Sequence, residues 1–267
     1  GKVRGLTDRP FGVDLLTAAP QDLQAKVQDI IDGGASVFVA GLGIPAEVVD
    51  QCHSQDVVVI NMCGKVSHAV RAVEAGCDVV VAQGTEAGGH TGQVATMALV
   101  PQVVDAVGGQ VPVVAAGGLF DGRGLAAALT LGADGIWVGT RFIATPEARA
   151  VAGYKDRLLA GAEDATTITR AYTGKTCRVI RNTYTDEFAA SGGAPEPFPG
   201  QVLKSMGDGA NHLGCDADEP GIDPDREFMP AGQGMGAIDE LVPAAELVRL
   251  FVAEAEAVLD RVATLRG

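Results

Sequence analysis

Short apolar runs alternate with amphipathic stretches along the first half of the chain. Six runs rich in β-branched residues predict strands, at residues 11–15, 36–40, 57–61, 78–82, 112–116 and 135–139. The stretches between them predict helices near residues 22–33, 46–54, 67–75, 99–107 and 122–131. Three of these helices end in glycine followed at once by a strand, as in repeated βα units. Strands that are apolar almost throughout are typical of a parallel sheet with both faces covered.

Two parallel architectures fit this order of elements, the doubly wound sheet and the (β/α)8 TIM barrel. Distinctive residues stand at the end of every predicted strand: Asp14, Gly41, Asn61, Gln83, Gly117 and Gly139. A barrel binds its ligands at the carboxyl ends of several strands, so this distribution favours an α/β TIM barrel. A barrel needs eight βα units and the sequence contains six. We therefore expect its first two strands to lie upstream of Gly1.

The alternation stops after Phe142. The remaining pattern predicts helices separated by loops, with the helices at residues 147–160, 163–167 and 238–265. We therefore predict a barrel domain that binds the cofactor and consists of residues 1–144 and 237–267. Residues 145–236 are predicted to form a smaller, mainly helical and irregular cap domain.

Composition limits the possible partners and the compartment. A chain of 267 residues with 47% hydrophobic content can bury a large core. The net charge of −14 argues against nucleic acid or an anionic membrane surface as a partner, because both would repel the protein. The five cysteines are widely spread, without a Cys-x-x-Cys pair, which is typical of a reducing compartment. No apolar run reaches the ~18 residues of a membrane span, and no signal peptide opens the chain. We expect a cytoplasmic protein.

A glycine-rich loop with a single histidine, residues 83–92, follows the fourth predicted strand. Glycine lets the backbone approach a ligand closely, and histidine is readily tuned for proton transfer near neutral pH. This combination favours a cofactor site with His90 as a base. Glu86 is expected to stay ionised and weakly basic in a wet loop. The other histidines are expected to be structural: His53, His68 and His212.

Two further glycine loops follow the last two predicted strands. Gly117-Gly118 opens a helix whose first amides can hold a phosphate, and Gly139-Thr140 follows the next strand. Tight turns alone would also explain these glycines, but together with residues 83–92 they favour a phosphate-bearing cofactor. No two histidines or cysteines have metal-ligand spacing, so no catalytic metal is expected. A nucleophile elbow, a Walker loop and a dinucleotide fingerprint are also missing from the sequence.

The run Ala82-Gln83-Gly84-Thr85-Glu86-Ala87-Gly88-Gly89-His90-Thr91-Gly92 resembles the signature of the nitronate monooxygenase (2-nitropropane dioxygenase) family, which are FMN-dependent TIM-barrel enzymes. Other motifs resemble this family in the same order: Thr7-Asp8-Arg9-Pro10-Phe11-Gly12-Val13-Asp14, Ala115-Ala116-Gly117-Gly118, Leu131-Gly132-Ala133-Asp134, Val138-Gly139-Thr140-Arg141-Phe142, Arg178…Arg181-Asn182 and Ala231-Gly232-Gln233-Gly234. The resemblance covers essentially the whole chain.

The resemblance implies that FMN lies across the strand ends. The motif residues implied to hold its phosphate are Gly117, Gly118, Gly139 and Thr140. Those implied to lie near the isoalloxazine are Gln83, Gly88, Gly89 and Gln233, and Gly84 and Gly234 belong to the same motifs. His90 matches the catalytic histidine of the family.

The implied reaction is oxidation of a nitronate or nitroalkane, a small-molecule substrate, with O2. A nitro group acidifies its α C–H, His90 removes this proton, and the electrons pass through the flavin to oxygen. Related flavin reductases share the fold and much of the loop, so an NAD(P)H-dependent enoyl-[acyl-carrier-protein] or quinone reductase is the alternative. A flavin-free lyase or isomerase for a sugar phosphate also fits the phosphate loops. If the protein bound a ligand without catalysing a reaction, His90 would have no evident role, so a non-catalytic binding protein is the least favoured interpretation. A homodimer is compatible with the sequence, which fixes neither the substrate nor the oligomeric state.

Overall fold

A computed structural model describes residues 2–17, 21–41, 43–212, 214–215 and 219–265. Six parallel strands form one sheet in chain order: β1 (Gly12–Leu16), β2 (Val37–Gly41), β3 (Val58–Cys63), β4 (Val79–Gln83), β6 (Val113–Ala116) and β7 (Gly135–Trp137). Five helices connect them: α1 (Leu23–Asp32), α2 (Ala46–His53), α3 (Val66–Glu74), α4 (Thr96–Val107) and α5 (Gly122–Thr130). These strands and helices confirm the predicted ones to within three residues at each end.

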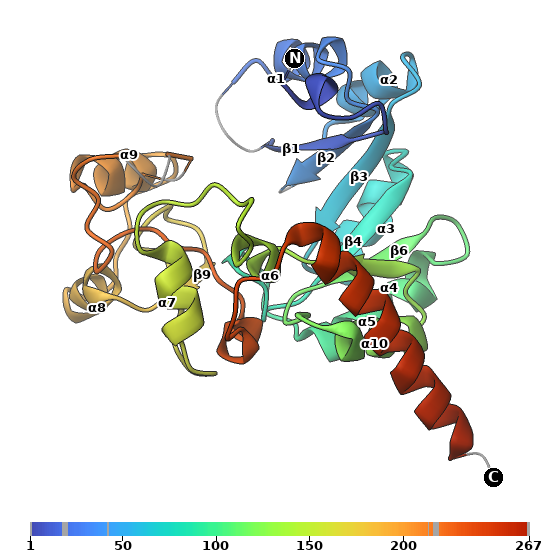
Figure 1. Cartoon of the computed structure of the whole chain (residues 1–267). Coiled ribbons are helices and arrows are strands. Elements are labelled where there is room, and N and C mark those ends of the chain that lie inside the picture. Colours follow the sequence, from blue (N-terminus) through green and yellow to red (C-terminus); the bar gives the residue numbers. More distant parts are fainter. Residues whose placement is uncertain (1, 18–20, 42, 213, 216–218, 266–267) are drawn as a thin grey trace.

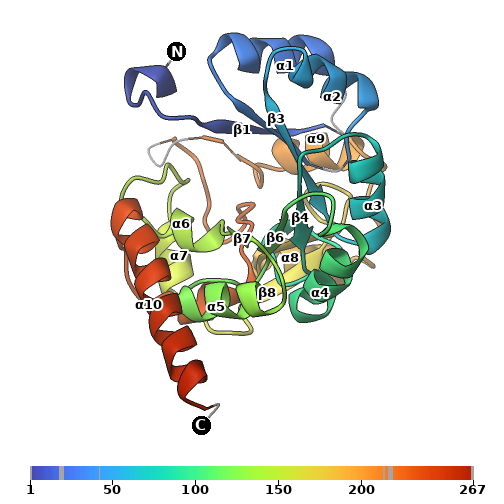
Figure 2. The ribbon, with the colours of Figure 1, turned by 90° about the vertical axis from the view of Figure 1, so that its right-hand side faces the viewer.

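The sheet curls in one direction, because each strand pairs with the one before it and the order never reverses. A doubly wound sheet would reverse its order at a switch point. Figure 2 shows α1–α5 in an arc around the outside of the curled sheet. The fold is therefore α/β with a half-barrel of parallel strands. The two additional upstream strands stay a prediction.

The main core lies between this sheet and its outer helices. Fully buried side chains from the strands, such as Phe38, Val59 and Val80, belong to the same core cluster as Leu99 and Val103 of α4. These strands are apolar on both faces because the outer face meets helices while the inner face lines the barrel side. Burying this surface contributes about 25 cal/mol per Å².

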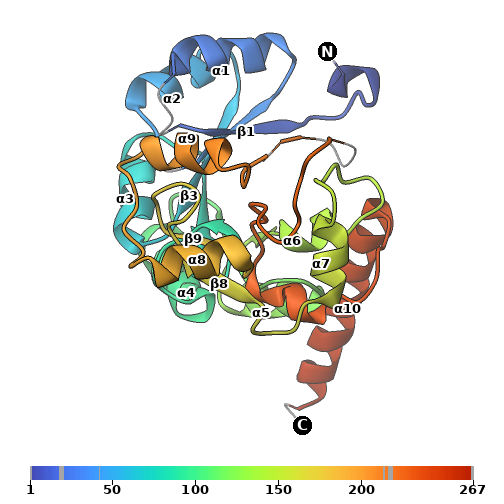
Figure 3. The same cartoon turned by 90° about the vertical axis from the view of Figure 1, so that its left-hand side faces the viewer.

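Residues 145–236 contain two strands besides their helices: α7 (Tyr154–Ala160), β8 (Thr166–Thr169), β9 (Cys177–Ile180), α8 (Thr183–Ala190) and α9 (Gly200–Gly207). The helix predicted at residues 163–167 is wrong, because Thr166–Thr169 pairs antiparallel with β9. Its β-branched residues favour an extended backbone. The helix predicted at residues 147–160 begins only at Tyr154. Figures 1 and 3 show α7, α8 and α9 grouped on one side of the sheet. Their assignment to a separate cap domain stays a prediction.

Short elements complete the chain: η1 (Val3–Gly5), β5 (Gly89–His90), α6 (Thr140–Ile143) and η2 (Gln233–Ala237). The last helix, α10 (Ala244–Thr264), begins six residues later than predicted. Pro243 stands at its N-cap, and the residue before a proline is pushed toward an extended backbone. Figure 1 shows the end of α10 extending beyond the rest of the molecule. Within the described ranges, no helix is both long and apolar enough to cross a membrane.

The α5–α10 contact depends on Gly122. The Gly122 amide donates to the Glu254 carboxylate at 2.8 Å. A Cβ atom on Gly122 would lie 2.4 Å from Glu254 Cβ and 2.6 Å from the Ala255 nitrogen. Gly122 therefore lets α10 lie directly on the first turn of α5.

We predict that Gly122→Ala destabilises the protein by about 1–3 kcal/mol, because the new methyl group overpacks a backbone contact. Urea unfolding measures the change. Gly109→Ala is the matched control, because a Cβ there would meet no atom within 4 Å, and its effect should stay within about 0.5 kcal/mol. Equal stability of the two variants would contradict this account of the helix contact.

Candidate active site

A cavity of about 890 Å³ lies at the carboxyl ends of the parallel strands. Its lining comes from the ends of β1, β2, β3, β4 and β7, from α3, from the loop that contains His90, and from residues 175–176. A cavity of this size at this edge of a parallel sheet is the usual ligand site of barrel folds. Besides His90, the polar residues of the lining are Asp14, Asn61, Lys65, His68, Arg71, Gln83, Thr91, Lys175 and Thr176.

His90 is fixed in the cavity by its backbone and by its ring. It belongs to β5, which pairs antiparallel with Cys177 of β9. Its carbonyl accepts a hydrogen bond from Gln83 Nε2 at 2.6 Å. Its ring Nε2 lies 2.9 Å from Thr173 Oγ1. Three separate segments therefore orient the imidazole.

The surroundings of His90 favour a neutral imidazole. Burial lowers the pKa of His90, and the positive charge of Lys175 lowers it further. Thr173 Oγ1 also lies 3.3 Å from the Lys175 carbonyl, which can accept the hydroxyl proton. When Thr173 donates there, it accepts from His90 Nε2–H, and Nδ1 is left as an unprotonated base.

The backbone of residues 84–88 contacts other backbone directly. A Cβ on Gly84 would lie 2.4 Å from the Thr96 nitrogen, and one on Gly88 would lie 2.7 Å from the Gly232 nitrogen. Gly117, at φ +102°, would place a Cβ 2.9 Å from the Gly84 carbonyl oxygen. These three glycines are thus required by contacts within the protein, whether or not a ligand is bound.

Glu86 has a structural task rather than that of a base. Its Oε2 accepts from both the nitrogen and Oγ1 of Thr96, each at 2.8 Å. Thr96 is the first residue of α4, and the N-cap Ala95 has no side-chain acceptor to offer. A carboxylate at this end also complements the helix dipole. Glu86 thereby joins the His90 loop to α4.

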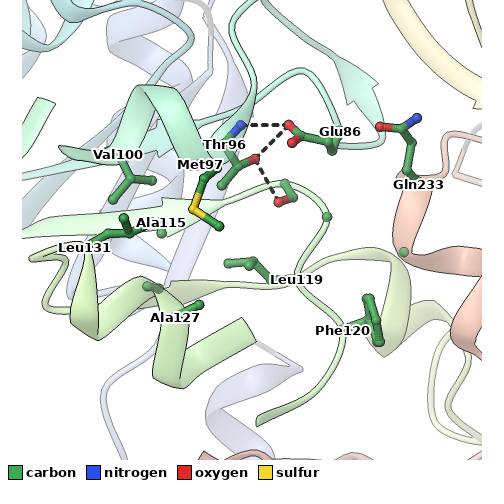
Figure 4. A pocket seen from close by; sticks show the side chains of 14 residues that line it. Glu86, Thr96, Met97, Val100, Ala115, Leu119, Phe120, Ala127, Leu131 and Gln233 are labelled. Atoms are coloured by element: carbon green, nitrogen blue, oxygen red, sulfur yellow. Dashed lines mark hydrogen bonds between the residues drawn. The ribbon is translucent and has the colours of Figure 1, made fainter. Parts of the chain in front are cut away.

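A second cavity of about 320 Å³ lies on the other side of this loop, between β6, α4 and α5. Figure 4 shows that side chains such as Met97, Val100 and Leu131 surround it, with Glu86 and Gln233 at one end. The lining is mainly apolar. The two cavities share no lining residue as described.

The structure divides the predicted site residues between the two cavities. Gln83, Gly88 and His90 line the larger one, whereas Gly117, Gly118, Gln233 and Gly234 line the smaller one. Gly84, Gly89, Gly139 and Thr140 are not part of either lining as described. A Cβ atom added to Gly139 would meet no atom within 4 Å. Thr140 Oγ1 accepts a hydrogen bond from the Gly232 amide at 2.9 Å.

The expectation that the first amides of α5 are free for a phosphate is wrong. The Asp121 carboxylate accepts from the amides of Arg123 and Gly124, and Glu254 accepts from that of Gly122. These carboxylates already satisfy the positive end of the helix. By contrast, the amides of Gly118 and Leu119, which precede the helix, have no acceptor among the described residues.

Sequence reasoning missed Thr173 and Lys175, which lie more than eighty positions from His90 and meet it only through the β5–β9 pairing. The basic, polar character of this segment was the available signal. His68, expected to be structural, lies in the lining of the larger cavity.

Nucleophilic catalysis by a cysteine and binding of a metal ion find little support here. Cys63 lines the larger cavity, but burial raises its pKa to about 12, so the thiol stays protonated and a poor nucleophile. In the part of the chain that the structure describes, no three His, Cys, Asp or Glu side chains are grouped so that they could hold a metal ion.

Comparisons with known proteins agree on one family. Residues 1–254 match the nitronate monooxygenase family. A Mycobacterium tuberculosis protein named a monooxygenase is 42% identical over 227 residues, which cover 84% of this chain and 59% of that protein. This chain therefore spans only about three fifths of the length of that relative.

Two solved structures have the same fold. FabK from Thermotoga maritima superimposes with a TM-score of 0.87 at 30% identity, covering 99% of this chain and 81% of that one. Nitroalkane oxidase from Streptomyces ansochromogenes superimposes with a TM-score of 0.82 at 28% identity, covering 98% and 84% of the two chains.

We predict that Lys175→Gln raises the pKa of His90, because the variant removes a positive charge that disfavours the imidazolium. Burial persists, so the pKa should still lie below that of an exposed histidine. Titration of the imidazole nitrogens by NMR measures it. Lys26→Gln, which removes the same charge from the exposed face of α1, should leave the pKa of His90 unchanged. An unchanged pKa in Lys175→Gln would contradict the coupling.

Proposed function

The chain belongs to the nitronate monooxygenase family, whose members are oxidoreductases, and we propose that it oxidises nitronates or nitroalkanes with FMN as its cofactor and O2 as the electron acceptor. The observation that carries this proposal is the oriented imidazole of His90, whose pKa is lowered by burial, in the large cavity at the strand ends. A general base needs an unprotonated nitrogen near working pH and access to its substrate, and His90 has both.

The chain's residues fit FMN at this edge of the sheet. The larger cavity has ample volume for a flavin beside a small substrate. The phosphate would be held by the free amides of Gly118 and Leu119 and by Gly139 and Thr140 at the next strand end. Gln83, Gly88 and Gly89 would lie against the isoalloxazine. Gln233 and Gly234 would support the same loop, because the Gln233 amide donates to the Glu86 carbonyl at 2.9 Å.

The residues of this chain would supply binding and the proton transfer. His90 takes the α proton of a neutral nitroalkane, and the electron pair of the broken C–H bond moves onto the nitro group to give the nitronate. Thr173 keeps the imidazole in position, and Lys175 offers positive charge near the developing anion. The chemistry that bound FMN would supply is transfer of electrons from the substrate to O2.

We predict that His90→Ala still binds FMN but turns over neutral nitroalkanes roughly 10²- to 10⁴-fold more slowly, the usual contribution of a general base. A preformed nitronate should be affected far less, because its proton is already gone. Oxygen consumption with each substrate measures the difference. His53→Ala is the control, since His53 is an exposed partner of Asp78 outside the cavity. Unchanged nitroalkane turnover in His90→Ala would remove the residue from the role of base.

The electron donor is tested separately on the FMN-loaded protein. Under anaerobic conditions, we expect a nitronate to bleach the flavin absorption and NADH to do so slowly or not at all. Rapid bleaching by NADH alone would replace the monooxygenase proposal with that of an NAD(P)H-dependent flavin reductase. A protein that binds no flavin would reject both.

A further inference from the structure

The lining of the larger cavity has a charge opposite to that of the whole chain. The sequence has 34 acidic and 20 basic side chains. The cavity lining has three permanently charged cations, Lys65, Arg71 and Lys175, and one carboxylate, Asp14. We call these three cations the basic rim. A cavity that collects positive charge in a protein of net charge −14 is suited to an anionic ligand.

The basic rim has no carboxylate partner of its own. None of its members forms an ion pair within the described residues. Arg71 Nε donates only to the Ser67 carbonyl, at 3.2 Å, and Lys175 Nζ lies 4.5 Å from the centre of the Phe198 ring. The positive charge acts on its neighbours, because Arg71 and Lys65 both lower the pKa of His68. Lys65 and Arg71 are thus exposed cations at the edge of the cavity, Lys175 is half-buried, and none of the three is neutralised by an ion pair among the described residues.

The cations of the basic rim come from separate points of the cavity lining. Lys65 precedes α3 and Arg71 lies six residues further, so their backbones are about 9 Å apart along the helix axis at 1.5 Å per residue. A diphosphate offers charged oxygens over a longer span than one carboxylate and bonds well to Lys and Arg. Lys175 lies at the His90 end of the cavity, since its charge acts on that imidazole.

The basic rim is also distinct from the expected phosphate site of FMN. Lys65 and Arg71 follow β3, whereas Gly118 follows β6, and β4 lies between these strands. Two strand spacings amount to about 10 Å. A phosphate held at the end of β6 would thus leave Lys65 and Arg71 free for another anion.

We propose that Lys65 and Arg71 of the basic rim bind a diphosphate group on a substrate or cosubstrate whose reactive end lies at His90 and Lys175. This inference rests on the proposed function for the role of His90, but the binding itself does not require turnover. A thioester of coenzyme A and NADPH are two sources of this chemistry, and binding of NADPH would favour the reductase alternative over the monooxygenase. Both carry a diphosphate and an additional phosphate.

The test measures binding by isothermal titration calorimetry, with inorganic pyrophosphate, coenzyme A and NADPH as probes, with and without saturating FMN. Trp137 is the single tryptophan of the chain and lines this cavity. A change in the emission of Trp137 therefore reports that pyrophosphate enters the cavity.

We expect the double variant Lys65→Gln/Arg71→Gln to bind pyrophosphate at least ~10-fold more weakly than the unaltered protein, as expected for lost hydrogen bonds to a charged group.

The matched control is Lys26→Gln/Arg249→Gln, which removes the same total charge from exposed positions on α1 and α10. This control variant should bind pyrophosphate like the unaltered protein.

Tighter binding of coenzyme A or of NADPH than of pyrophosphate supports the proposal and identifies the source of the diphosphate. The proposal fails if pyrophosphate binds equally to both double variants, if FMN displaces it, or if neither larger probe binds more tightly than pyrophosphate, which would mean an adventitious ion only. A protein that binds the probes but leaves nitronates unoxidised would reject the proposed function and keep the diphosphate site.

Discussion

Direct backbone contact around residues 84–92 is the constraint on which the rest of this site depends. The Gly84 amide donates to the Ala116 carbonyl of β6, the Gln233 amide to the Glu86 carbonyl, and the Thr91 amide to the Thr176 carbonyl. No side chain can fit between these segments, because Cβ atoms on Gly84 or Gly88 would overlap neighbouring backbone. Three parts of the chain that are remote in sequence are thereby fixed around one loop. A loop held in this way can present a side chain to a cavity with little loss of entropy on binding.

The electrostatics of the site follow from that constraint. The β5–β9 pairing that holds His90 also brings Thr173 and Lys175 to its ring. Burial and the Lys175 charge both lower the pKa of His90, so the two effects act in the same direction on its protonation. The same loop sends Glu86 to the first turn of α4. One segment therefore positions His90 and also provides the carboxylate that caps the first turn of α4.

The sequence predicted the repeated βα units well, because their signals are local. Apolar runs and glycine at helix ends depend on neighbours within a few residues, as in the turn at Gly132 (φ +93°). It predicted the region after Phe142 poorly. The strand Thr166–Thr169 is stabilised by pairing with β9, a contact that periodicity alone does not reveal. Similarly, the pattern around Gly117-Gly118 could not show that Asp121 and Glu254 occupy the amides of α5, since Glu254 lies 132 residues away from Gly122. His90 could be found because its flanking glycines are adjacent in sequence, whereas its partners are not.

The charge of the whole protein and the charge of its cavity act over different distances. At physiological ionic strength the Debye length is about 8 Å, so most of the acidic surface is screened from a ligand that has reached the strand ends. A ligand at the strand ends is within reach of Lys65, Arg71 and Lys175, which line the cavity. The distant acidic surface therefore has little power to repel an anion there, whereas the neighbouring cations still attract it. Net charge thus argues against extended polyanions, such as nucleic acids, that must contact a wide surface. It does not argue against a small anion that needs only the cavity.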